Sequence, residues 1–138
     1  WSESQMSTVI PSLDAGLAQL KALADFIDQG SNNATFAFYS SAKPANTSTA
    51  TDEAKRLVTM TLPKPSFKKL NADNIELQQT DAAVVLKDGT ALWARLYSGS
   101  GSAIADFIVG DHIALNNPVL VAGSTLMLNS VILRPVIQ

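Results

Sequence analysis

The sequence predicts a mainly β domain: an antiparallel, jelly-roll-like β-sandwich of about eight strands, preceded by one amphipathic helix. Short apolar or alternating segments recur at the spacing of roughly 8–12 residues that is typical of sandwiches, separated by Gly, Pro, Asn and Ser. No alternation of strand and helix patterns supports a parallel sheet. At 138 residues without cysteine, the chain is expected to form one domain, over 13–138, whose core needs no disulfide.

The single helix is predicted over residues 13–29. Ser12 is a good N-cap, Pro11 suits a helix start, and Gly30 is a natural stop. Apolar residues recur at intervals of three and four, which places them on one helix face. This face comprises Ile10, Leu13, Leu17, Leu20, Ala24 and Ile27, and Leu23 and Phe26 widen it. The pattern favours packing on the chain's own sheet; a seam between subunits is the alternative, although it lasts less than about three heptads.

Two strands are predicted between the helix and the middle of the chain, at 34–40 and 56–62, and the segment 66–70 is expected to be a short strand or a loop. In the first of them, Phe36 and Phe38 point to the same side of the sheet because side chains alternate along a strand. The polar stretch between the first two strands is too long for a tight turn and is expected to be a surface loop.

The segment 74–97 is predicted to form a central β-hairpin. The Asp-Gly pair at 88–89 is typical of a two-residue type I′ turn, with the glycine at positive φ. Pairing across that turn places Val84 opposite Trp93, with Leu86 on the diagonal. Both faces of such a hairpin are apolar, so we expect it to be covered on both sides.

The remainder of the chain continues the β pattern. The Gly/Ser segment 98–102 is expected to be a flexible turn, followed by strands at 103–109 and 119–121. The segment 124–136 alternates throughout and is predicted to be one long final strand.

Charge and composition argue against several classes of function. The net charge is −2 and no basic stripe is present, so nucleic-acid binding is not expected. No apolar run approaches the length of about 18 residues that a membrane span needs, and residues 1–11 lack the regions of a secretion signal. Only 16% of the residues are charged, against about 25% in typical domains. Such a surface fits a protein that binds partners, and equally a neutral monomer.

The sequence offers little catalytic chemistry. His112 is the single histidine and no nucleophile motif accompanies it; together with Asp111 or Asp106 it would form the centre of a hydrolase. Asp81 and Asp88 lie beside predicted strands, where turn-forming aspartates are common. We therefore expect no catalytic residue, no metal site and no cofactor.

Two aromatic residues on one strand face leave a further alternative open. Trp93 and Tyr97 are spaced to form a stacking platform for sugars, as in a carbohydrate-binding module. Aromatic residues in the middle of a central strand are more often core. We predict that the ring of Trp93 is buried; the binding-module hypothesis requires it to be exposed.

Several segments in a fixed order resemble a known group of proteins. They are LDAGLAQLKALADFIDQG, FAFYSSAKPA, LVTMTLPKPSF, GTALWARLYSGSG and LNNPVLVAGSTLMLNSVIL, which together span about residues 12–134. This order resembles small virion structural proteins of tailed bacteriophages, encoded among head and neck genes.

The resemblance implies a non-enzymatic structural role. It points to a capsid decoration or minor capsid protein that binds the major capsid lattice, with a neck or tail component of the virion as the alternative. The implied partners are the major capsid protein or other virion proteins and further copies of the chain, with a trimer favoured. The implied location is the phage particle, after synthesis in the cytoplasm of the bacterial host.

The candidate interface lies at the beginning of the chain. Residues 1–12 are predicted to form an arm that orders on a partner. The widened helix offers a second apolar line to a neighbour, because one line is enough to dock on the parent sheet. The expected interface residues are Trp1, Met6, Val9, Ile10, Leu23 and Phe26. The alternative is a frayed tail before a helix that packs only within its own chain.

Overall fold

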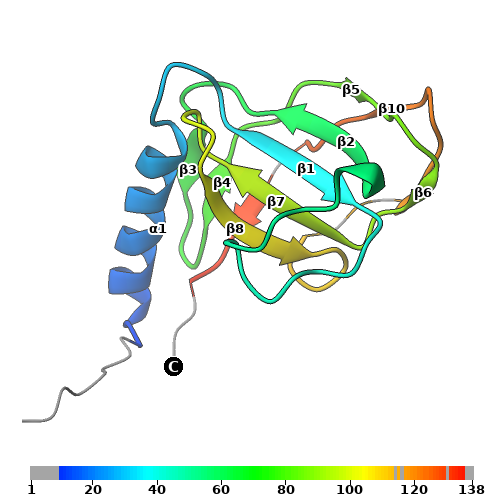
Figure 1. Ribbon diagram of the computed structural model, residues 1–138. Helices are drawn as coiled ribbons and strands as arrows, with labels where there is room; N and C mark the ends of the chain where they lie inside the picture. The colour runs from blue at the N-terminus through cyan, green and yellow to red at the C-terminus, as the bar shows by residue number, and fades with distance from the viewer. Residues whose placement is uncertain (1–9, 114, 116, 130, 136–138) are drawn as a thin grey trace, which may run out of the picture.

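The computed structural model describes residues 10–113, 115, 117–129 and 131–135 (Figure 1). These residues form one α-helix, one 3₁₀ helix and eleven strands that pair antiparallel, so the prediction of a mainly β, antiparallel fold is confirmed with more strands than expected. The helices are α1 (Leu13–Ile27) and η1 (Glu53–Lys55). The strands are β1 (Thr35–Tyr39), β2 (Arg56–Thr61), β3 (Phe67–Leu70), β4 (Ile75–Leu77), β5 (Ala83–Val84), β6 (Gly89–Thr90), β7 (Trp93–Tyr97), β8 (Ala103–Ile108), β9 (Val119–Leu120), β10 (Thr125–Leu126) and β11 (Val131–Leu133).

The strands form two larger sheets and two ribbons. The four-stranded sheet has the order β2-β1-β7-β8, and the three-stranded sheet has the order β11-β4-β3. The ribbons are β10-β5 and β6-β9. Helix α1 lies beside β3 and β4 at one end of the molecule, and β6 and β10 lie at the other end (Figure 1).

Both larger sheets and the helix contribute to one core. The inward side chains of β1 and β7 alternate as predicted, and Phe36 and Phe38 are fully buried. The core includes Leu17, Ala24 and Ile27 from α1, Phe36 and Phe38 from β1, Val58 and Met60 from β2, Ile75 and Leu77 from β4, Ala94 and Leu96 from β7, and Val131 and Leu133 from β11. Burial of this apolar surface is the main force holding the sheets together.

Helix α1 begins and ends close to the predicted residues. Ser12 is the N-cap, and its hydroxyl accepts the backbone N–H of Ala15 at 3.3 Å. The helix ends at Ile27 instead of residue 29, because the N–H of Asp28 bonds to the carbonyl of Phe26 and the chain turns away at Gly30, where φ is 96°.

We expect Ser12→Ala to lower the free energy of unfolding by about 1 kcal/mol, because the N–H of Ala15 loses its acceptor. Urea denaturation measures the change. Ser31→Ala, at an exposed serine beyond the other end of the helix, serves as the control and should leave the free energy of unfolding within about 0.5 kcal/mol of the parent chain. Equal stability of the two variants would contradict the capping role.

The predicted central hairpin is wrong. The segment before the Asp-Gly pair, β5, pairs with β10, while β6 pairs with β9 and β7 lies between β1 and β8. Gly89 does not adopt positive φ. Distant groups hold this region: the Asp88 carboxylate accepts the N–H of Ala122 at 2.7 Å, and the Lys87 ammonium donates to the carbonyl of Ala54 at 2.8 Å. These long-range bonds take the place of a local turn.

The predicted long final strand is also wrong, because the chain passes there from one sheet to another. Strand β10 belongs to the ribbon with β5, and β11 belongs to the three-stranded sheet beside β4. Thr80 fixes the passage: its hydroxyl accepts the N–H of Leu128 at 2.9 Å, and its own N–H donates to the Leu128 carbonyl at 2.9 Å. Leu128 and Val131 are both buried, which breaks the alternation expected of one strand.

The Gly/Ser turn at 98–102 packs against the end of the helix. The N–H of Gly99 donates to the Ile27 carbonyl at 3.0 Å, and the Gly99 carbonyl accepts the N–H of Asn32 at 3.3 Å. A side chain at Gly99 would collide with the backbone of Asn32, so only glycine fits. The segment is therefore a turn, as predicted. Its bonds to the end of the helix were not predicted.

Candidate functional site

The outward face of the four-stranded sheet carries an aromatic cluster. The rings of Tyr39 and Trp93 stack with centroids 4.7 Å apart and an interplanar angle of 19°. Trp93 is only 1% exposed, and its indole N–H donates to the hydroxyl of Ser41 at 3.2 Å. The predicted burial of Trp93 is confirmed. Its predicted neighbours are wrong: Val84 and Leu86 are exposed residues of another part of the molecule.

A buried ion pair lies next to this cluster. Arg95 and Asp106 are opposite one another on β7 and β8, with side chains 4% and 3% exposed. The Arg95 guanidinium donates to both carboxylate oxygens of Asp106, at 2.7 Å from Nε to Oδ1 and 3.1 Å from Nη2 to Oδ2. It also donates to the carbonyls of Thr49 at 2.7 Å and Asn46 at 3.2 Å. One guanidinium thus fixes the sheet pairing and the loop 40–52 that covers it.

The pKa values of Arg95 and Tyr39 are both shifted in the direction that favours their present hydrogen bonds. The hydrogen bonds that Arg95 donates to the Asp106 carboxylate raise the pKa of Arg95 above its usual value. Burial raises the pKa of the Tyr39 hydroxyl, and its hydrogen bond to the Tyr97 hydroxyl, at 3.4 Å, adds to the shift. Both shifts keep Arg95 cationic and Tyr39 neutral, which are the states that a permanent structural network requires.

The residues of the hydrolase hypothesis do not come together. Asp106 is engaged by Arg95, whereas His112 is exposed and its Nδ1 accepts the N–H of Ile108 at 3.0 Å. His112 and Asp111 border a cavity of about 290 Å³, and no hydrogen bond joins His112 to Asp111 or Asp106 within the described residues. The arrangement lacks the base-to-carboxylate bond that orients a catalytic imidazole.

The other aspartates considered above have structural partners. The Asp81 carboxylate accepts the N–H of Thr61 at 2.8 Å, and the Asp88 carboxylate accepts the N–H of Ala122 at 2.7 Å. In the part of the chain that the structure describes, no group of three His, Asp or Glu side chains could hold a metal ion. None of the helices described there is long and apolar enough to cross a bilayer.

The predicted interface residues fall into three groups. Trp1, Met6 and Val9 lie outside the described residues. Ile10 and Phe26 are 52% and 42% exposed, so their side chains are available to a partner. Leu23 is half-buried and packs against the core, so the second apolar line of the helix belongs partly to the parent domain.

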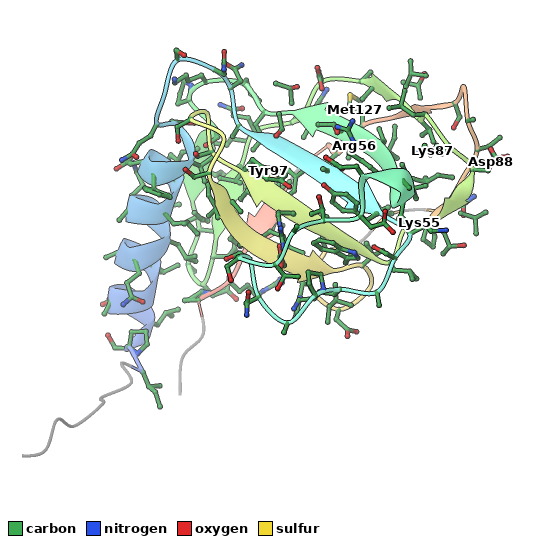
Figure 2. All side chains as sticks on the ribbon, in the orientation of Figure 1. Lys55, Arg56, Lys87, Asp88, Tyr97 and Met127 are labelled. Atoms are coloured by element: carbon green, nitrogen blue, oxygen red, sulfur yellow. The ribbon has the colours of Figure 1, made fainter. Side chains whose placement is uncertain are left out.

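A second apolar surface lies at the opposite end of the molecule, in the region of β5, β6, β9 and β10. Val84 and Val119 are 57% and 56% exposed, and Leu86 and Val121 are exposed to a similar degree. Figure 2 shows Lys87, Asp88 and Met127 on this side, away from α1. Sequence reasoning missed this surface, because the hairpin expected to contain Val84 and Leu86 was predicted to be covered on both sides.

A groove opens within this surface. β9 and β10 follow one another in the chain through a tight turn, in which the N–H of Ser124 donates to the Val121 carbonyl at 3.1 Å. They do not pair with each other, since each pairs with a different strand. The space between the segments 115–121 and 124–129 is a groove of about 470 Å³.

No protein-family model, curated protein or solved structure matches the chain. The resemblance of the sequence segments and the surfaces described above are therefore the basis for proposing a function.

Proposed function

We propose that this chain is a non-enzymatic structural protein of a bacteriophage virion, a capsid decoration or minor capsid protein that binds the major capsid lattice. The virion role rests on the resemblance of the sequence segments to phage structural proteins, and the observation in the structure that supports a binding role is the exposure of apolar side chains at both ends of the molecule. Ile10 and Phe26 lie at the helix, and Val84, Val119 and Val121 lie at the far end. Scattered single residues of this kind are ordinary, but a group on one surface is typical of a binding site for another protein.

The polar groups support binding over catalysis. The buried charges of Arg95 and Asp106 are paired with each other, and Arg95 also donates to backbone carbonyls. The carbohydrate-binding alternative is less well supported, because Trp93 lies beneath loop 40–52 and offers no ring face to a sugar. A neck or tail component would use the same apolar surfaces, and its position on the particle is what separates it from a decoration protein.

The proposal includes the finer architecture. The four-stranded sheet and the three-stranded sheet contribute to one core from two sides, which supports a two-layered β-sandwich of the jelly-roll type. It also includes self-association: homo-oligomers with closed symmetry are the norm, and a trimer would match a three-fold position on a capsid.

Binding to particles tests the proposal. Virions that lack this chain should bind the purified protein, and Phe26→Ser should reduce the amount that co-sediments by at least tenfold, because an apolar contact at the helix is lost. Ala22→Ser, at an exposed position of the same helix, is the matched control and should bind like the parent chain. Electron microscopy of particles with the labelled protein then separates head, neck and tail.

Failure to bind any part of such particles would contradict the virion role. Equal binding by the Phe26→Ser and Ala22→Ser variants would contradict the helix as the contact surface.

A further inference from the structure

The short strands β5, β6, β9 and β10 together form one bent ribbon. Residues 83–91 run antiparallel to residues 118–126 in a single register, because the pairs of β5 with β10 and those of β6 with β9 fall on the same line. A backbone bond continues between the two paired parts, from the N–H of Val85 to the Ser124 carbonyl at 2.8 Å. The ribbon is therefore one two-stranded element with an inward and an outward face.

Burial alternates along this ribbon. Val85, Ala91 and Leu120 point inward and are buried. The side chains between them point outward, because successive side chains of a strand lie on opposite faces. Within the paired segments the outward apolar side chains are Val84, Leu86, Val119 and Val121, and Leu92 and Met127 continue the alternation at the two ends; each of the six is at least 40% exposed. Of the ten exposed large apolar side chains in the described part of the chain, six thus belong to this ribbon and its ends.

The outward face carries almost no charge. Its polar side chains are Thr90, Thr125 and Asp88. The Asp88 carboxylate accepts a backbone N–H of the ribbon itself, and the neighbouring Lys87 donates to the carbonyl of Ala54. Both charges are engaged by the chain's own backbone, so the face suits an uncharged apolar surface.

We propose that copies of this chain associate through the outward face of the ribbon. About a quarter of the residues of a typical protein are charged, and another protein would bury some of them on this face without a partner, which is unfavourable. The same face of a second copy brings apolar and hydroxyl side chains and an aspartate that is already engaged. Apolar contacts with few charges are typical of homo-oligomers, in which a surface patch meets its own copy across a symmetry axis.

The ribbon face is large enough for such a contact. With roughly 32 Å² for each apolar carbon group, the exposed fractions of the six side chains amount to about 350 Å² in each copy. Two copies in contact bury about 700 Å² of this apolar surface, or about 1,100 Å² in total when roughly 65% of the interface is apolar. Specific interfaces begin at about 1,000 Å². The contact lies at the small end of that range, so association is expected to depend on protein concentration.

The inference rests on the proposed function and deepens it. It assigns the ribbon end of the molecule to contacts between copies and leaves Ile10 and Phe26, at the helix, for the virion partner. Helix and ribbon lie at opposite ends of the molecule, so both contacts can form at the same time (Figure 1).

Substitutions on the two strands of the ribbon test the inference in the full chain. Leu86→Glu and Val121→Glu each place a carboxylate on the outward face, and each should raise the dissociation constant of the oligomer at least tenfold in analytical ultracentrifugation. Leu70→Glu is the matched control: Leu70 and Leu86 are both 59% exposed, but Leu70 lies on β3, outside the ribbon. This variant should associate like the parent chain, and circular dichroism checks that all three are folded.

The absence of cysteine from the chain allows a second measurement. A Val121→Cys chain offers a single thiol, so a bismaleimide reagent can link it only to another copy. We expect at least tenfold more linked dimer than with a Leu70→Cys chain at the same concentration.

The inference is overturned if the parent chain stays monomeric up to millimolar concentration, or if the two ribbon variants associate like the Leu70→Glu chain. It is also overturned if the ribbon substitutions abolish co-sedimentation with particles but leave self-association intact, because the face then contacts another virion protein. A monomeric parent chain that still binds particles would contradict this inference and leave the proposed function standing.

Discussion

Arg95→Met is expected to lower the free energy of unfolding by about 3–5 kcal/mol, the cost typical of leaving a buried charge without its partner. The Asp106 carboxylate is 3% exposed in the parent chain, and the substitution removes both hydrogen bonds that it accepts from the guanidinium. The carbonyls of Asn46 and Thr49 lose their donors at the same time, so loop 40–52 is released from the sheet. Urea denaturation measures the stability, and cleavage within loop 40–52 by proteinase K, a protease of broad specificity, reports the release of the loop.

Two further variants isolate the cause. The double variant Arg95→Met/Asp106→Leu should recover most of the loss, because it removes both buried charges and leaves none uncompensated. Lys21→Met removes one partner of an exposed ion pair, with Asp25, and should change the free energy of unfolding by about 0.5 kcal/mol or less. If Arg95→Met costs no more than Lys21→Met, the buried pair does not hold the sheet and the loop.

Trp93→Ala is expected to cost about 3–5 kcal/mol of stability, as large-to-small substitutions in a core do. The ring fills the space between Tyr39, on which it stacks, and the loop residue Ser41, to which it donates a hydrogen bond. The guanidinium carbon of Arg95 lies 5.2 Å from its centroid and adds a cation–π contact. Removal of the indole leaves a cavity that a β-sheet, being rigid, fills poorly.

The neighbouring residue provides the control. Leu92 is exposed, and Leu92→Ala should change stability by less than about 1 kcal/mol. Thermal and urea unfolding of both variants gives the comparison, together with a glycan-binding assay. A Trp93→Ala chain that unfolds like the parent chain but no longer binds a glycan would revive the carbohydrate-binding module.

Elements whose signal is local were predicted well. The caps and the apolar spacing of α1 lie within a few residues of each other, so Ser12 and Gly30 were identified from the sequence. The alternation in β1, β2 and β8 gave their positions within about two residues, the usual uncertainty of strand ends. The pairing partners of the strands were not predictable in this way. The Asp-Gly pair predicts a local turn even when the strands on either side of it pair with distant segments, as β5 and β6 do here.

The candidate site was predicted in part for the same reason. Burial of Trp93 follows from its position within an apolar strand, although its true neighbours come from β1 and from loop 40–52. Exposure of Ile10 and Phe26 agrees with a contact surface on the helix, whereas Leu23 contacts the core. The groove depends on β9 and β10 choosing different partners, and no local pattern in 115–129 encodes that choice.

The strand order also determines when the protein can fold during its synthesis. Residues 75–77 lie beside residues 131–133, and residues 35–39 lie beside residues 93–97. A growing chain therefore exposes Phe36 and Phe38 on the ribosome before β7, one of the two strands that flank β1, exists. Contacts this far apart in sequence make folding slow, in the range of milliseconds to seconds for β proteins of similar topology. The interior closes only after Leu133 has been added, so a chain cut short before β11 is expected to be captured by chaperones or to aggregate instead of folding.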